Sequence, residues 1–178
     1  MRIRKFKFAD LPRVLQIERT SFGPEGCGTT TFLAHLLRDR KYSYVAEDER
    51  GAVVGYALVR MTLGWLGARR GGITSIAVDA AHRRQGIGRA LMAEALDRLR
   101  EHEVQQADLE VSVTNRAAQS LYEAVGFRRA QLLPYYYGPQ GDGMRMVLDL
   151  RRESRRKTVC ESWPARPPHH AGDHLHDH

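Results

Sequence analysis

One continuous segment near the middle of the chain constrains the fold more than any other feature. An apolar stretch, Ile73–Val78, runs into a polar loop, and the loop opens into a helical pattern at Gly86 and Gly88. Glycine lets backbone N–H groups approach a ligand closely, and the unpaired N–H groups at a helix start bind phosphate well. Three arginines add positive charge there: Arg83, Arg84 and Arg89. The segment predicts a strand–loop–helix unit that binds a pyrophosphate, the alternative being a plain unit with a basic rim.

Apolar periodicity on both sides of this segment predicts alternating strands and helices. The predicted strands are Ile3–Phe8, Tyr42–Glu47, Val53–Leu63, Gly72–Val78, Ala107–Val113, Phe127–Tyr136 and Met144–Leu150. The predicted helices are Leu11–Thr20, Thr31–Arg38, Gly86–His102 and Arg116–Val125. Strands alternate with helices through residues 72–129, which implies a partly parallel sheet. We therefore expect an α/β fold, a mixed sheet of about seven strands flanked by about four helices.

The composition changes sharply near Leu150. The 178 residues suffice for one domain of ordinary size, and we assign it to residues 1–150. Residues 151–178 are basic and rich in Pro and His, with few residues able to form a core, so we expect a disordered tail. Its last ten residues hold five histidines: His169, His170, His174, His176 and His178. They could bind a transition metal, but a solvated tail is the favoured interpretation, and we expect no metal requirement.

Charge and cysteine content indicate the kind of partner and the cellular compartment, but they identify no particular partner. The net charge of +7 favours anionic partners, and nucleic acid, ribosomes and CoA all qualify. No apolar stretch approaches the roughly 18 residues that cross a bilayer, so we expect no membrane contact. The two cysteines, Cys27 and Cys160, lie far apart in unlike surroundings, which favours a reducing cytoplasm. Direct contact with nucleic acid is expected at most through the basic tail.

Two segments together resemble the cofactor site of the GNAT superfamily of N-acetyltransferases. Ile76–Asp79 followed by Arg83–Leu91 resembles its acetyl-CoA motif, and Leu109–Phe127 resembles the second half of the site. The resemblance implies acetyl-CoA as cosubstrate, bound where the strands Gly72–Val78 and Ala107–Val113 separate. The residues that it assigns to the cofactor are Ile76, Ala77, Val78, Arg84, Gln85, Gly86, Ile87, Gly88, Arg89 and Asn115. Within the superfamily, the chain is most similar to the RimI-like enzymes, which acetylate protein N-termini.

Two residues in the second segment are candidates for catalysis. Glu110 lies in a strand, on the face opposite Leu109 and Val111, where a carboxylate is costly unless it is hydrated, paired or protonated. It could equally face solvent or an arginine. Tyr122 shares a helical stripe with apolar residues, so a buried core tyrosine is the simpler interpretation. The RimI-like resemblance instead implies that Glu110 is the general base and Tyr122 the general acid of a direct transfer. Asn115 is by type also a good helix N-cap.

Residues 133–146 resemble the substrate-side loop of the same enzymes. The resemblance assigns acceptor binding to Tyr135 and Tyr136, while three adjacent tyrosines could also form an aromatic edge strand. We therefore expect an acetyl-CoA-dependent enzyme that acetylates the N-terminal α-amine of a protein, such as a ribosomal protein. The alternatives are an acetyltransferase for a small-molecule amine or a lysine, and a catalytically idle CoA-binding regulatory module.

Overall fold

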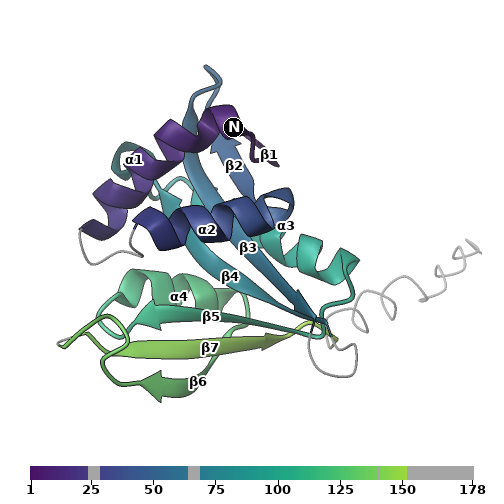
Figure 1. The fold of residues 1–178 in the computed structure, drawn as a ribbon, viewed down its shortest axis with the longest axis vertical. Coiled ribbons are helices and arrows are strands. Elements are labelled where there is room, and N and C mark those ends of the chain that lie inside the picture. Colours follow the sequence, from purple (N-terminus) through teal and green to yellow (C-terminus); the bar gives the residue numbers. More distant parts are fainter. Residues whose placement is uncertain (24–28, 64–68, 140, 152–178) are drawn as a thin grey trace, which may run out of the picture.

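The chain forms a mixed sheet with helices on both faces (Figure 1). The computed structural model describes residues 1–23, 29–63, 69–139 and 141–151. The strands are β1 (Arg2–Lys5), β2 (Tyr44–Glu47), β3 (Val53–Leu63), β4 (Arg69–Val78), β5 (Gln106–Ser112), β6 (Arg128–Leu133) and β7 (Gly143–Asp149). The helices are α1 (Leu11–Phe22), α2 (Thr29–Asp39), α3 (Ile87–Glu101) and α4 (Arg116–Ala124). The predicted fold class, with seven strands and four helices, is confirmed for this part of the chain.

The strand order places one parallel pair near the middle of the sheet. The order is β1-β2-β3-β4-β5-β7-β6, and every neighbouring pair is antiparallel except β4 and β5. Helix α3 connects β4 to β5, as expected for a parallel crossover. The prediction of a partly parallel sheet is therefore confirmed.

The parallel strands β4 and β5 are paired over only part of their length. β4 and β5 pair at Gly71–Ala107, Gly72–Asp108 and Ile73–Leu109, and beyond these positions the two strands diverge (Figure 1). The rest of β4 remains paired with β3 on its other side. The sheet thus opens beyond Ile73, between the two strands for which the family resemblance implied a separation.

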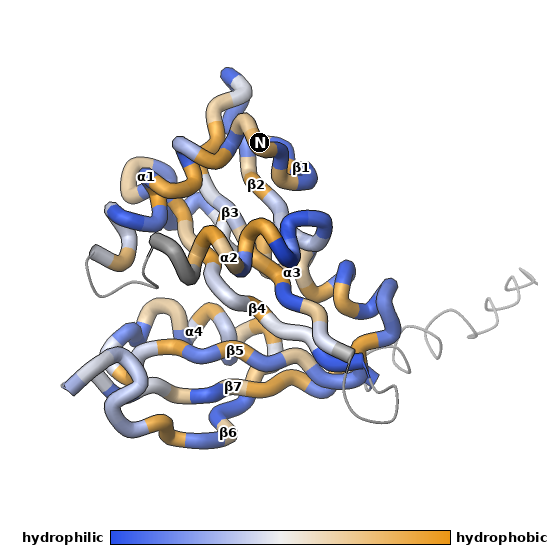
Figure 2. The backbone as a smooth tube through the Cα atoms, in the orientation of Figure 1, coloured by the Kyte–Doolittle hydropathy of each residue, from blue (hydrophilic) through white to orange (hydrophobic). Residues whose placement is uncertain are grey.

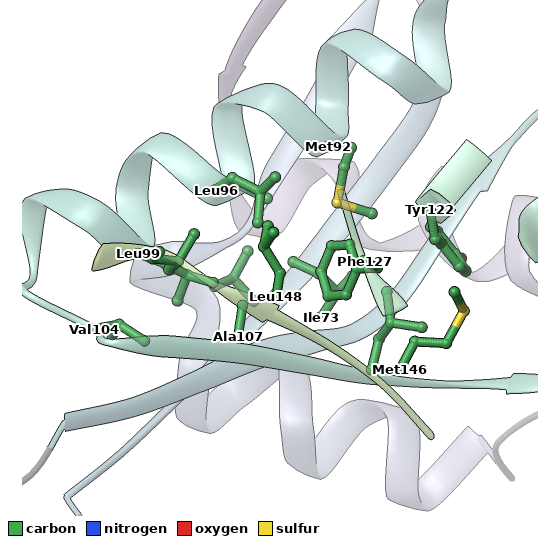
Figure 3. Close-up of a cluster of buried hydrophobic side chains, with 14 of the residues drawn as sticks. Ile73, Met92, Leu96, Leu99, Val104, Ala107, Tyr122, Phe127, Met146 and Leu148 are labelled. Carbon is green, nitrogen blue, oxygen red and sulfur yellow. The ribbon is translucent and has the colours of Figure 1, made fainter. Parts of the chain in front are cut away.

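Three apolar clusters hold the helices against the sheet. Val14 and Ile17 of α1 and Phe32 of α2 pack with Tyr56 and Leu58 on one face. Helices α3 and α4 cover the other face, and Figure 3 shows side chains of α3 directed at those of the strands. Polar and apolar residues alternate along β5, so that one face of this strand joins the core and the other does not (Figure 2).

Several predicted boundaries were wrong. The first strand ends at Lys5 instead of Phe8, and β4 begins at Arg69 instead of Gly72. β6 ends at Leu133 instead of Tyr136, because the chain turns at Pro134 and Tyr135 takes a φ of 58°. The second helix begins at Thr29 instead of Thr31. Residues 24–28, between α1 and α2, and the predicted tail beyond Arg151 lie outside the described residues. None of the described helices is both long and apolar enough to cross a membrane.

Candidate active site

A cavity of about 390 Å³ lies where the strands diverge, between the end of β4, the start of α3 and the helix α4. It is lined by all the residues that the sequence assigned to the cofactor except Gln85. Gln85 lines a separate hollow with Met1 and Asp48. The structure therefore brings together residues 76–78, residues of the loop and helix start, and Asn115, which lies about 30 positions further along the chain.

The start of α3 leaves room for a ligand against its backbone. Gly86 is the N-cap, with a φ of 79°, and no atom lies within 4 Å of the position that a Cβ would take. Arg84 also has a positive φ, 63°, so the loop turns sharply just before the helix. The amides of the first helical turn have no partner within a helix. An open cavity beside these amides and three arginines suits an anion.

The loop before α3 is fixed on both sides. The Arg83 guanidinium donates a hydrogen bond of 3.0 Å to the carbonyl of Val78. Asp79 accepts a hydrogen bond from the amide of Ala81 and forms an ion pair with Arg13 of α1. The hydrogen bond from the Ala81 amide is the main cause that holds the pKa of Asp79 below its usual range. Burial opposes this effect, and the hydrogen bond and charge of Arg13 reinforce it. The ionised carboxylate therefore stabilises this loop at neutral pH.

A second cavity, of about 270 Å³, adjoins the first one on the side of β5. The residues that line both are Phe22, Ile76, Asn115 and Tyr122. Glu110 of β5 lines the second cavity, so the two predicted catalytic residues meet there. The arrangement places a phenol at the junction between the two cavities and a carboxylate in the second one.

Glu110 is held by two arginines. Its Oε1 accepts a hydrogen bond of 3.1 Å from the Nε of Arg145 on β7, and its Oε2 lies 3.8 Å from Arg60 on β3. Arg60 also pairs with Asp108, two residues earlier on the same face of β5. The side chain of Glu110 is 13% exposed. The interpretation of Glu110 as a carboxylate that faces an arginine is thus confirmed, and it still lines the cavity.

Tyr122 belongs to the core and to the cavity at once. It is 7% exposed and packs edge-on against Phe127, with 6.2 Å between ring centroids. Burial raises the pKa of its phenol to about 12. The hydroxyl therefore keeps its proton at neutral pH, as a general acid must.

Asn115 is the N-cap of helix α4. Its side-chain oxygen accepts a hydrogen bond of 3.1 Å from the amide of Ala118, at the start of α4. Next to it, the Gln119 amide donates to the carbonyls of Ser112 and Val113, which ties α4 to the end of β5. Because Asn115 also lines both cavities, the cap and a ligand contact are compatible in one residue.

The structure distributes the three adjacent tyrosines differently from the sequence prediction. Tyr135 and Tyr136 are 71% and 49% exposed, and the side chain that lines the second cavity is that of Tyr137. Burial, with Tyr136 and Glu110 nearby, raises the pKa of Tyr137. The turn is fixed by Asp142, which accepts a hydrogen bond from the amide of Tyr135. Sequence reasoning could not tell these tyrosines apart, because it continued the strand through the turn.

Sequence reasoning also missed Glu18, which lines the second cavity from α1. A signal was present: Leu11, Val14, Leu15 and Glu18 share the spacing of one helical face, so a carboxylate interrupts an apolar stripe. Among the described residues, no group of three or more His, Cys, Asp or Glu side chains could hold a metal ion. The histidines of the tail are not among those residues.

The chain belongs to the acetyltransferase (GNAT) family, whose sequence pattern matches residues 11–127. The match spans the loop before α3, the separated strands and α4, which together form the two cavities. The predictions of the family and of an acetyltransferase are therefore confirmed.

Within this family, the chain is similar to enzymes named for the acetylation of protein N-termini. The chain is 32% identical over 157 residues to an N-alpha-acetyltransferase of Sulfurisphaera tokodaii, which covers 84% of this chain and 93% of the relative. It superposes on the ribosomal-protein-S18-alanine N-acetyltransferase of Escherichia coli with a TM-score of 0.71 and 27% identity, covering 84% of this chain and 93% of that one. A chain of the NatC complex, bound to Gag peptide and CoA, shares the fold with a TM-score of 0.73 and 23% identity, covering 83% and 97%.

Proposed function

We propose that this protein transfers the acetyl group of acetyl-CoA to the N-terminal α-amine of a protein. The observation that carries the proposal is the junction of the two cavities. An anion-binding helix start lies on one side, and Glu110 lines the other with Tyr122 between them. The similarity to N-alpha-acetyltransferases supports a peptide N-terminus as acceptor.

The residues of the first cavity fit the cosubstrate. The amides at the start of α3, with Arg84 and Arg89, would hold its pyrophosphate, and Gly86 leaves space for the close approach. The separated strand β4 would offer the backbone of residues 76–78 to the pantetheine arm. When bound, acetyl-CoA supplies an activated acetyl thioester and a thiolate leaving group.

Glu110 and Tyr122 have complementary roles in this proposal. The acceptor amine must lose a proton to become a nucleophile, and the Glu110 carboxylate would accept it, directly or through water. Arg145 and Arg60 fix the position of that carboxylate and compensate its charge. The buried phenol of Tyr122 would donate a proton to the departing sulfur as charge develops on it. A transfer of this kind requires no covalent enzyme intermediate.

The acceptor would enter through the second cavity. Tyr137 lines this cavity, and the exposed Tyr135 and Tyr136 lie beside it in sequence. We propose that Tyr137 contacts the first residues of the acceptor, and that Tyr135 and Tyr136 contact its continuation outside. A ribosomal protein is one acceptor of this class, as in the relative from Escherichia coli.

The first prediction is that purified protein releases CoA thiol from acetyl-CoA in the presence of N-terminal peptides. A screen should compare peptides beginning with Ala, Ser or Met with the same peptides blocked at the N-terminus, with free lysine and with small amines. We expect turnover with free N-termini and none with blocked ones. Faster turnover of lysine or small amines would contradict the proposed acceptor. Binding of CoA without turnover of any amine would instead favour the regulatory-module alternative.

A further inference from the structure

The second cavity holds a carboxylate that the proposed chemistry does not use. Glu18 of α1 is 6% exposed and lines this cavity together with Glu110, Tyr122 and Tyr137. Its Oε2 accepts a very short hydrogen bond from the hydroxyl of Tyr56 and one of 3.3 Å from the hydroxyl of Ser75. Glu18 and Glu110 thus reach one small space from different elements.

The two carboxylates differ in how their charge is compensated. Glu110 has Arg145 and Arg60 beside it. Glu18 forms no ion pair with any described residue, and its hydrogen-bond partners are two neutral hydroxyls. Burial raises the pKa of Glu18, and the hydrogen bonds from Tyr56 and Ser75 partly oppose that effect. A carboxylate buried without a cation is costly, and a cationic ligand beside it would relieve the cost.

Hydrogen bonding within the core does not require a charge at this position. The buried Tyr56 hydroxyl needs one acceptor, and the Ser75 hydroxyl already lies 2.9 Å from it. A neutral amide at position 18 would serve the same hydroxyl. The chain nevertheless places an ionisable carboxyl group at the wall of the cavity, within an otherwise apolar helical stripe.

We propose that Glu18 binds the protonated amine of the acceptor through a charge-assisted hydrogen bond. The inference rests on the proposed function. An N-terminal amine has a pKa of about 8, so most of it arrives as an ammonium at neutral pH and needs a counter-charge in a desolvated space. Glu18 supplies that charge during binding, and Glu110, already balanced by arginines, is left to act on the proton. Tyr56 and Ser75 position the Glu18 carboxylate for this contact.

The test compares two peptides in binding. One is a peptide that the wild-type protein acetylates, and the other is its des-amino analogue, in which hydrogen replaces the ammonium group. Their affinities are measured with CoA present, for the wild type, for Glu18→Gln and for Glu47→Gln. Glu47 is a matched control, because it is a part-buried carboxylate that pairs with Arg4 and lines neither cavity.

We expect the wild type to prefer the amine peptide by about 10- to 100-fold, the range of a hydrogen bond to a charged group. Glu18→Gln should reduce this preference to near unity while the affinities for the des-amino peptide and for CoA stay unchanged. Glu47→Gln should keep the wild-type preference. If Glu18→Gln retains the preference, or loses affinity for both peptides equally, the proposal is overturned, because the second result reveals a structural role.

Two further results separate the possible failures. If Glu18→Gln is too unstable to assay, Glu18→Asp provides the test, because it keeps the charge but withdraws it by one methylene. The preference for the amine peptide must then fall, and an unchanged preference overturns the proposal. If the wild type acetylates no amine at all, the proposed function fails and this inference fails with it. Turnover by the wild type with no effect at Glu18 refutes the inference alone.

Discussion

At the scale of single residues, the site depends on how charge and polarity are compensated. Glu110 can be retained in a largely buried position because Arg145 of the neighbouring strand β7 and Arg60 of β3 face it. Tyr122 has no charged neighbour that raises its pKa, and burial alone shifts it to about 12. The fold thus places two arginines beside the Glu110 carboxylate, and it buries the Tyr122 phenol, which keeps its proton.

Replacement of Tyr122 by Phe is expected to lower kcat by roughly 100- to 10,000-fold, the usual range for a lost general acid. Glu110→Gln should lower it similarly, because the amide cannot accept the proton. Binding of acetyl-CoA, measured by calorimetry, should change little in either variant. Because the pKa of Tyr122 lies near 12, this tyrosine stays protonated below about pH 10. Below that pH, the pH profiles of the wild type and of Tyr122→Phe should therefore have the same shape. Equal losses of turnover and of cosubstrate binding would contradict both assignments.

At the scale of elements, the gap in the sheet is set by glycine in β4. A Cβ at Gly72 would lie 2.3 Å from the carbonyl oxygen of Asp108, so the closed end of the parallel pair tolerates no side chain there. At the open end, cavities lined by residues of β4, β5, α3 and α4 lie where the pairing stops. The close approach at Gly72 and the divergence beyond Ile73 therefore define where the cavity begins.

Gly72→Ala should destabilise the protein by at least about 1–3 kcal/mol, because the new methyl group must push β5 away or strain β4. For a chain of this size, that corresponds to a fall in Tm of roughly 2–12 °C. The control is Gly88→Ala, since a Cβ there meets its nearest neighbour, Leu121, at an ordinary 3.5 Å. A thermal melt of both variants is sufficient. An unchanged Tm for Gly72→Ala would mean that β4 and β5 pair less tightly than the structure indicates.

At the scale of the whole molecule, Leu150 joins the end of the final strand to the core. Leu150 is 1% exposed, and its amide donates a hydrogen bond to the carbonyl of Gln105. This hydrogen bond ties the end of β7 to the start of β5. The Leu150 side chain belongs to the same apolar cluster as side chains of α3. The final β-strand is thus fully integrated before the basic segment begins.

Deletion of residues 152–178 should therefore leave the Tm and the turnover of short peptides essentially unchanged, since the cut preserves Leu150. Comparison of the full chain with the shortened one, by thermal melt and by CoA release, tests the assignment of residues 1–150 as the domain. A second deletion that also removes Leu150 serves as the contrast and should lower the Tm. Loss of activity in the first variant would show that the tail contributes to the fold or the site.

The sequence by itself predicted the fold class and the strand–loop–helix unit at Gly86, and two of its segments carried the resemblance to the family. These properties follow from local patterns: hydrophobic periodicity, the glycines at 86 and 88, and residues adjacent in one segment. That Tyr137 lines the second cavity, while Tyr135 and Tyr136 are more exposed, depended on a turn after Leu133 that strand periodicity did not reveal.

Only the tertiary structure decided which side chains share a cavity and which charges are compensated. Arg145, Arg60 and Glu110 come from three strands, and Glu18 reaches the same space from a helix more than 90 residues earlier in the chain than Glu110. Such contacts depend on strand order and register, which no local pattern specifies, because the free energy that fixes them comes from packing between distant segments.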